Sequence, residues 1–190
     1  MATINSISLP CYCDPRSGRI SKLKTVCASD ILVFQEPYYS PPALNAQPYT
    51  MQTGDIILRD EARIWEWQCE PTESTHAESM VTGDHTAYFS QNIAFRFGKT
   101  DYMHQFWLYE LLEKDWVVCY ESRNGQVRVV GTPEHPMRFL SNYANAKAQN
   151  LGFSFSGQTK KPAPFMAGYE NNILFGFHIN QPKDLTYDYI

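Results

Sequence analysis

The sequence predicts a mainly β fold, a two-sheet β-sandwich or barrel with one flanking α-helix, in a single domain of 190 residues. Two observations predict strands: apolar and polar side chains alternate along His85–Phe97, and Asn124-Gly125 separates two valine-rich runs. A third observation limits the helical content, because only residues 102–114 repeat apolar side chains with the period of a helix. The remaining connections are expected to be extended loops or arms.

Alternation is clearest from His85 to Phe97, because a strand turns successive side chains to opposite faces. The face expected to be buried carries Phe89, Ile93, Phe95 and Phe97. The opposite face carries Tyr88, Ser90, Asn92, Ala94 and Arg96. This pattern indicates a sheet with one buried face.

Shorter runs of β-branched and aromatic residues predict the other strands. In chain order they are Ile20–Val26, Ile31–Phe34, Asp55–Leu58, Arg63–Cys69, Trp116–Glu121, Gln126–Val130, Met137–Tyr143, Leu151–Ser156 and Asn172–Ile179. Trp65 and Trp67 fall on one face of their strand, and such a pair is most often part of a core. Residues 70–83 are polar and lack helical periodicity, so a loop or a long exposed hairpin is expected there.

The helix expected over residues 102–114 can be capped by Thr100 or Asp101, whose side-chain oxygens can accept from its first free amides. Its apolar face consists of Met103, Phe106, Trp107, Leu108, Leu111 and Leu112. A helix of this length is marginal alone, so it must be stabilised by packing on the sheet. Beyond it, Asn124-Gly125 predicts a tight hairpin turn, because both residues accept positive φ.

Three segments are expected to extend from the domain: residues 1–17, residues 36–53 and residues 181–190. The middle segment holds four prolines and three tyrosines between Glu36 and Thr50, which favours an extended path. Because tyrosine is a good interface anchor, we interpret this segment as an arm that lies on a neighbouring subunit, with a disordered loop as the alternative. The candidate interface residues are Tyr38, Tyr39, Pro41, Pro42 and Tyr49.

Composition and charge argue against several classes of protein. The net charge of −4 comes without a basic stripe, which is unlike a sequence-specific nucleic acid binder. The N-terminus lacks the basic and apolar regions of a secretory signal, and no apolar stretch is long enough to span a membrane. Five scattered cysteines fit synthesis in a reducing cytoplasm better than a disulfide scaffold.

Motifs for catalysis or for binding metals and cofactors are weak throughout the chain. Cys11-x-Cys13 with Cys27 lacks the usual zinc spacing and a nearby fourth ligand. The histidines form no His-x-His or His-x-x-x-His pattern, and neither a Gly-x-Ser-x-Gly nucleophile elbow nor a glycine-rich phosphate loop is present. We therefore expect neither an enzyme nor a bound cofactor or metal.

Taken in order, these features resemble structural proteins of tailed bacteriophages, especially those of phages and prophages of Bacteroidetes. The segments that carry the resemblance are Gly18–Lys24, Gln91–Phe97, the helix with Leu108, Leu111 and Leu112, Trp116–Gly131, Ser156-Gly157 and Pro162–Phe165. They cover about two-thirds of the chain, and they are packing and turn signals.

A tail-tube-type protein folds as two packed sheets flanked by a helix, and its rings, hexameric in a tube, stack around a lumen that conducts DNA. The resemblance therefore implies a subunit of a virion tail or neck, made in the cytoplasm of a bacterial host. Its partners would be copies of itself and neighbouring virion proteins. A long N-terminal part and a strongly aromatic helix depart from a minimal tube subunit, which leaves a tail terminator, a connector or a distal tail component open.

Two other interpretations stay open on the sequence alone. In a monomeric carbohydrate- or ligand-binding β-sandwich, Trp65, Trp67 and the tyrosines would line a sugar platform instead of a core. In a hydrolase, His135 or His85 would have to lie beside an acid and a nucleophile in one cleft. A self-assembling subunit forms rings or tubes whereas a binding module stays small, so particle size separates these classes.

Overall fold

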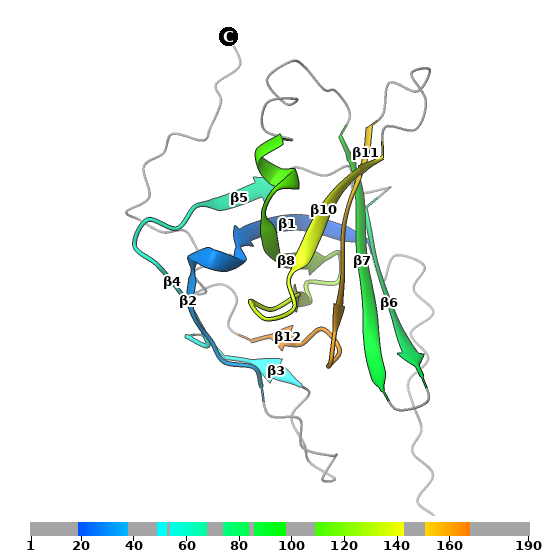
Figure 1. Ribbon diagram of the computed structural model, residues 1–190, viewed down its shortest axis with the longest axis horizontal. Helices are drawn as coiled ribbons and strands as arrows, with labels where there is room; N and C mark the ends of the chain where they lie inside the picture. The colour runs from blue at the N-terminus through cyan, green and yellow to red at the C-terminus, as the bar shows by residue number, and fades with distance from the viewer. Residues whose placement is uncertain are drawn as a thin grey trace, which may run out of the picture.

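A computed structural model gives the structure of the chain (Figure 1) and describes residues 19–37, 49–52, 54–67, 74–83, 86–97, 109–142 and 151–167. The expected extensions at residues 1–17 and 181–190, the strand at Asn172–Ile179, most of the arm and the first part of the helix lie outside these residues.

The fold is mainly β, as predicted, and the described residues include one α-helical turn at 109–112 and a 3-10 turn at Ala28–Asp30. The strands are β1 (Ile20–Cys27), β2 (Ile31–Phe34), β3 (Thr50–Met51), β4 (Ile56–Leu58), β5 (Ile64–Trp67), β6 (Thr75–Thr82), β7 (Ala87–Phe97), β8 (Asp115–Ser122), β9 (Val127–Val130), β10 (Met137–Asn142), β11 (Leu151–Thr159) and β12 (Phe165–Met166).

Ten strands form one strongly curled sheet, and β2 with β4 forms a small second sheet. The main sheet runs in the order β3-β12-β9-β8-β10-β11-β7-β6, and β1 joins β8 to β5. In Figure 1, β6, β7 and β11 run vertically whereas β1 and β8 cross behind them. The sheet curls far enough for β6 to meet the start of β1, where Arg19 bridges Thr75 and Ile20 N donates to Ser74 O at 3.1 Å.

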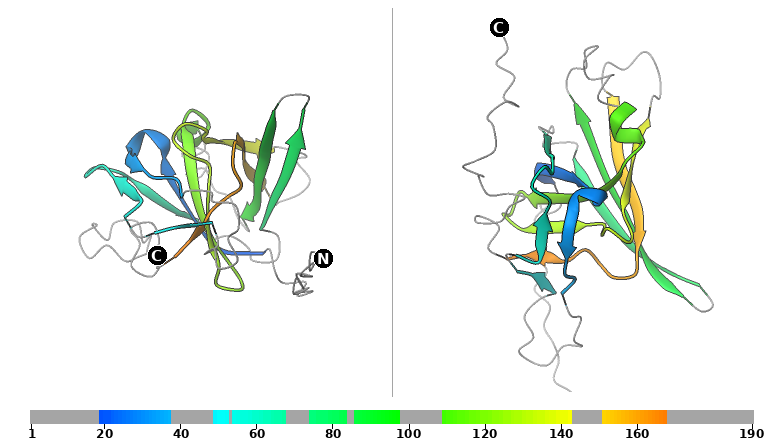
Figure 2. Two further views of the ribbon diagram at one scale, coloured as in Figure 1. Left: turned by 90° about the horizontal axis from the view of Figure 1, so that it is seen from below. Right: turned by 60° about the vertical axis from the view of Figure 1, so that its left-hand side comes forward.

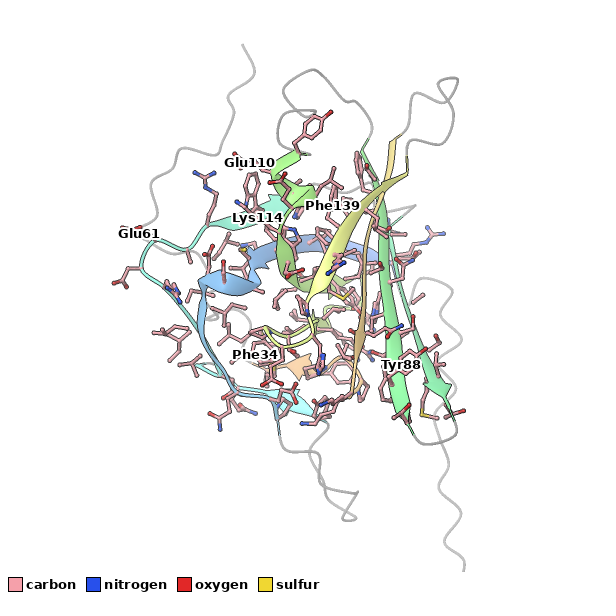
Figure 3. All side chains as sticks on the ribbon, in the orientation of Figure 1. Phe34, Glu61, Tyr88, Glu110, Lys114 and Phe139 are labelled. Atoms are coloured by element: carbon pink, nitrogen blue, oxygen red, sulfur yellow. The ribbon has the colours of Figure 1, made fainter. Side chains whose placement is uncertain are left out.

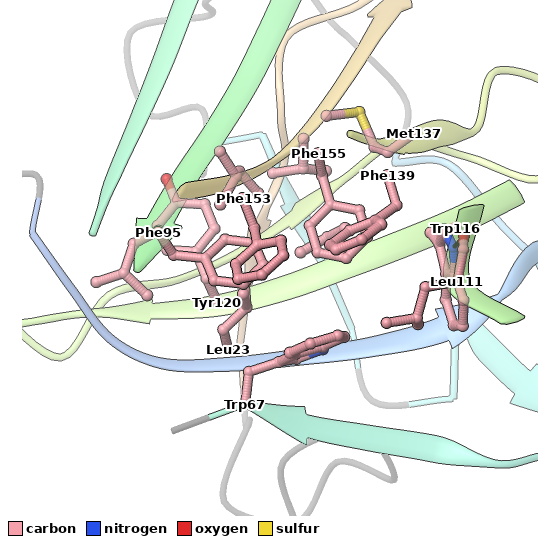
Figure 4. Packing of buried hydrophobic residues seen from close by; sticks show 14 of the residues in the cluster. Leu23, Trp67, Phe95, Leu111, Trp116, Tyr120, Met137, Phe139, Phe153 and Phe155 are labelled. Atoms are coloured by element: carbon pink, nitrogen blue, oxygen red, sulfur yellow. Dashed lines mark hydrogen bonds between the residues drawn. The ribbon is translucent and has the colours of Figure 1, made fainter. Parts of the chain in front are cut away.

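Strand β8 is buried on both faces because it separates two hydrophobic clusters. Trp116 and Tyr120 belong to the larger cluster inside the curled sheet (Figure 4). Val117 and Cys119 belong to the smaller cluster under β2 and β4. Strands covered on both faces carry continuous apolar runs, which explains why this segment lacks the alternation of β7.

The larger cluster is built from aromatic rings that touch one another. Trp67 stacks on Phe139 with the ring centroids 6.1 Å apart and also contacts Phe95 and Phe155. Its Nε1 donates to Thr25 Oγ1 at 2.9 Å, so the indole brings no unpaired donor into the core. Trp67 is therefore a core residue, as its strand position predicted, and it cannot also form a sugar platform on the surface.

The sequence left a loop or a long exposed hairpin open for residues 70–83, and the structure has a strand there that forms the first half of a hairpin with β7. Strand β6 pairs with β7 from Thr75 opposite Ala94 to Thr82 opposite Ala87. The two strands form a hairpin that projects beyond the rest of the sheet (Figure 2). Polar alternation along an exposed ribbon gives no apolar face, which is why the sequence pattern did not predict this strand.

Two shorter elements also differ from the expectations. Thr50–Met51 of the expected arm forms β3, and Met51 is fully buried in the smaller cluster. The described helical turn ends at residue 112 instead of 114, and Leu112 is exposed whereas Leu111 is buried. Trp116 Nε1 donates to Leu111 O at 2.9 Å, so a core side chain satisfies a carbonyl at the end of this turn.

Candidate functional site

Four polar side chains, the polar cluster, gather where the β6–β7 hairpin faces β8 across the interior. His76 and Glu78 come from β6, Gln91 from β7 and Tyr120 from β8. His76 and Glu78 lie two residues apart and so point to one side of their strand, and Gln91 likewise shares its side with Ile93. The register places Glu78 directly opposite Gln91.

His76 and Tyr120 join β6 to β8 across the interior. The Tyr120 hydroxyl lies 2.8 Å from His76 Nδ1, and the ring centroids lie 5.1 Å apart. Burial lowers the pKa of His76 to about 4; the Glu78 carboxylate opposes this shift and Arg128 adds to it. Burial also raises the pKa of Tyr120 to about 12. Both groups are therefore uncharged at neutral pH.

Glu78 accepts two hydrogen bonds through a single oxygen. Gln91 Nε2 donates to Glu78 Oε2 at 2.9 Å, and Ala163 N donates to the same oxygen at 2.8 Å. A carboxylate can only accept, so the amide nitrogen of Gln91 must face it, which fixes the orientation of that amide. Gln91 Oε1 and His76 Nε2 are buried without a hydrogen-bond partner in the described part of the chain. Ordered water is the usual partner for such atoms.

A small hollow lies beside the polar cluster, between β9 and the segment that joins β11 to β12. Gln91 contributes to its lining, together with Tyr49 and with Phe34, which is labelled in Figure 3. At its edge Lys161 Nζ lies 2.6 Å from Glu36 Oε2. Burial, with a smaller contribution from Glu36, raises the pKa of Tyr49 to about 12, so this phenol is uncharged at neutral pH.

The polar cluster offers hydrogen-bonding groups without a reactive nucleophile. Among the described residues Cys119 is a buried free thiol, and burial raises its pKa far above the usual range, which keeps it protonated. Within the same residues no three His, Cys, Asp or Glu side chains come together as metal ligands would. The arrangement suits an ordered water or a small polar molecule that donates to Gln91 Oε1.

A second notable surface is the outer face of the small sheet formed by β2 and β4. The pairing shifts register between Ile31 and Val33, which marks a bulge at Leu32. As a result Leu32 is 64% exposed and the cross-strand pair Val33 and Ile57 is 41% and 43% exposed. Ile31 points the other way, into the smaller cluster. We call Leu32, Val33 and Ile57 the outer apolar face.

Of the five candidate interface residues, the structure describes only Tyr49. Tyr38, Tyr39, Pro41 and Pro42 lie outside the described residues. Tyr49 directly precedes β3 and is half-buried, and its backbone O accepts from Phe165 N at 2.9 Å. It therefore belongs to the body of the domain through its backbone, and its side chain lines the hollow.

Asn124 and Gly125 lie in the turn that joins β8 to β9. Gly125 has a φ of 77°, and its N–H donates to Ser122 O at 2.9 Å. Ser122 Oγ donates to Asn124 Oδ1, and Ser122 N donates to Gln126 O at 2.8 Å. This pattern matches a type I turn closed by a left-handed glycine, so Gly125 supplies the positive φ that the turn requires.

Sequence reasoning missed the polar cluster. Gln91 occupies an inward position of β7 between Phe89 and Ile93 and is only 1% exposed. A polar residue at an inward position of an alternating strand was the available signal for it. His76 and Glu78 gave no such signal, because the strand that carries them was not predicted.

Comparison with known proteins gives no relative for this chain: no family model, no curated protein and no solved structure matches it. In the part of the chain that the structure describes, no helix is both long and apolar enough to cross a membrane.

Proposed function

We propose that the chain is a virion structural protein, a tail-tube-type or tail-connector subunit that assembles with itself into rings around a DNA-conducting lumen. The virion assignment rests on the resemblance of its sequence pattern to tailed-phage structural proteins. The assembly part rests on one observation, the outer apolar face of β2 and β4.

The outer apolar face supports assembly because a small sheet normally needs only one apolar side. The inner side of β2 and β4 already packs on the smaller cluster through Ile31 and Ile56. The bulge at Leu32 turns a second set of large apolar side chains outward, where they remain exposed. Contiguous exposed apolar side chains mark interaction sites more often than free surface. The expected arm begins two residues after β2, so it would start beside this face.

The test is the size of the purified protein and of a charge variant. Mass photometry over a concentration series, with negative-stain electron microscopy, should show rings or tubes with a central lumen for the wild type. Leu32→Lys should reduce the fraction of rings and tubes, because it places a charge in the contact. Leu140→Lys is the matched control, because Leu140 on β10 is 46% exposed and lies outside this face. A wild type that stays monomeric at every concentration would refute the proposal.

A ligand-binding module is the second candidate, favoured by the hollow beside the polar cluster. Gln91 Oε1 is a buried acceptor without a partner among the described residues, as expected where a ligand or water completes a site. Trp67 is buried in the core and cannot form a sugar platform on the surface. The hollow is therefore the better location for a ligand-binding site. A monomeric protein that binds a polyol or glycan in a screen would favour this candidate over assembly.

A further inference from the structure

The projecting strand β6 has one edge that pairs with β7 and an opposite edge that is mostly unpaired among the described residues. Along that outer edge the pairing consists of the bridge between Arg19 and Thr75 and the bond from Ile20 N to Ser74 O. Beyond this point no described strand lies against β6. A free strand edge offers a row of unpaired N–H and C=O groups to another chain.

The direction of each peptide group in β6 follows from its two ends. Ser74 O points to Ile20, away from β7, whereas Gly83 N bonds to Thr86 O on the β7 side. N–H and C=O of one residue share a side, and successive residues alternate. Glu78, Met80 and Thr82 therefore present their backbone groups on the outer edge.

We propose that this outer edge pairs antiparallel with β6 of a second copy of the chain, with Met80 on the two-fold axis. In this register Met80 faces Met80 of the other copy, Glu78 faces Thr82, and Ser79 faces Val81. The outward backbone groups of Glu78, Met80 and Thr82 then meet one another in hydrogen-bonded pairs.

Charge and exposure select this register. Moving the axis to Glu78 would oppose two carboxylates, which is unfavourable in a cross-strand pair. Moving it to Ser79 would bring Thr82 of the second copy opposite His76, next to the bridge that Arg19 already makes with Thr75. The Met80 register avoids both conflicts and covers Met80 and Val81, which are 62% and 37% exposed.

The segment that precedes Arg19 is the competing occupant, because it arrives antiparallel at Thr75 and could continue along β6. Its sequence argues against that path. Asp14-Pro15 and Ser17-Gly18 are turn signals, which favour a bend away from β6 over a continued strand. Strand β6 itself contains no such turn signal.

This two-fold contact closes after two copies, so it is separate from the ring contact of the proposed function. It should persist in the Leu32→Lys variant, whose defect lies on another face. Failure of ring assembly and failure of β6 pairing are thus distinguishable in one set of samples.

Disulfide trapping tests the contact. In a hydrogen-bonded antiparallel pair the Cα atoms lie about 5.5 Å apart, within the range of a disulfide. Met80→Cys should therefore give a covalent dimer under mild oxidation, with a peptide linked through position 80 of both copies in mass spectrometry. Leu140→Cys, of comparable exposure, is the control and should give no such dimer. A link from position 80 to Cys11 or Cys13 of the same chain would overturn the proposal in favour of the N-terminal segment.

A proline variant supplies the second arm of the test. Met80→Pro removes an N–H that points outward, so the ladder with β7 stays intact and the circular dichroism spectrum should be retained. The dimer seen by sedimentation at high concentration should be lost. Ser79→Pro removes an N–H that bonds to β7 and should instead destabilise the hairpin. An unchanged mass distribution in folded Met80→Pro, together with no linked peptide in Met80→Cys, would refute β6 pairing.

Discussion

At the scale of single residues, His76 is held in the interior as a neutral imidazole. Its burial, with a smaller contribution from Arg128, favours the uncharged ring and lowers its pKa from 6.5 to about 4. The unfolded chain binds a proton on this residue at a higher pH than the folded chain does. Stability from the neutral imidazole is therefore complete above pH 6.5 and declines as the pH falls toward 4.

The variant His76→Gln isolates this effect, because glutamine does not titrate. Between pH 7 and pH 4 the wild type should lose on the order of 2–3 kcal/mol more unfolding free energy than the variant. Urea unfolding at several pH values measures both curves. Parallel curves for the two proteins would show that His76 does not contribute to acid sensitivity.

Gly131 is a position where only glycine fits. It has a φ of 79°, and an added Cβ would lie 2.8 Å from Met137 Cγ and 3.2 Å from Trp116 O. Gly131→Ala should lower the free energy of unfolding by about 2–4 kcal/mol, because the strain of a left-handed backbone adds to a steric clash in the core.

Gly125→Ala is the matched control, since its φ is 77° and no heavy atom lies within 4 Å of its added Cβ. It should cost only about 1–2 kcal/mol, the strain term alone. Chemical denaturation gives both values. Equal losses in the two variants would mean that the packing around Gly131 relaxes at no cost.

At the scale of elements, the sequence pattern of a strand depends on how many of its faces are buried. Ile93 and Phe95 alternate with polar residues because β7 has one buried face, and both are buried as predicted. Strand β8 is apolar on both sides because it is covered twice. Strand β6 is exposed along most of its length, so its pattern carries no packing signal.

The expected arm yields a prediction at this scale. Changing Tyr38 and Tyr39 to Ser should weaken ring or tube assembly and leave the monomer folded, because tyrosines at an interface contribute buried apolar area. Tyr109→Ser is a suitable control, since Tyr109 is 73% exposed and lies at the helical turn. Mass photometry gives the assembled fraction of each variant. Assembly at the wild-type level in the double variant would show that the arm is not an interface.

At the scale of the whole molecule, β8 contributes side chains to both hydrophobic clusters, so we expect them to unfold as one cooperative unit. Phe139 on β10 belongs to the larger cluster. Val117 on β8 belongs to the smaller one, and β8 also contributes residues to the larger cluster. We expect Phe139→Ala to cost about 3–5 kcal/mol and Val117→Ala about 1–3 kcal/mol.

Both variants should still unfold in a single transition. Tryptophan fluorescence reports mainly on the larger cluster, which holds Trp67 and Trp116, whereas far-ultraviolet circular dichroism reports on all strands. Coincident midpoints from the two probes are expected. An early circular dichroism transition confined to Val117→Ala would show that the smaller cluster unfolds independently.

The sequence by itself determined the mainly β class, most strand positions, the β8–β9 turn and the core role of Trp67. These features depend on local pattern, because alternation and turn residues act over a few neighbours. What only the tertiary structure decided depends on distant partners. The curled sheet brings β6, β7 and β8 together across the interior, which pairs His76 with Tyr120 and buries Gln91 against Glu78. The bulge that exposes Leu32 and the edge of β6 that no described strand covers beyond Thr75 also follow only from the packed fold. Such contacts leave no periodic trace in the chain, since each partner is chosen by the packing of the whole fold.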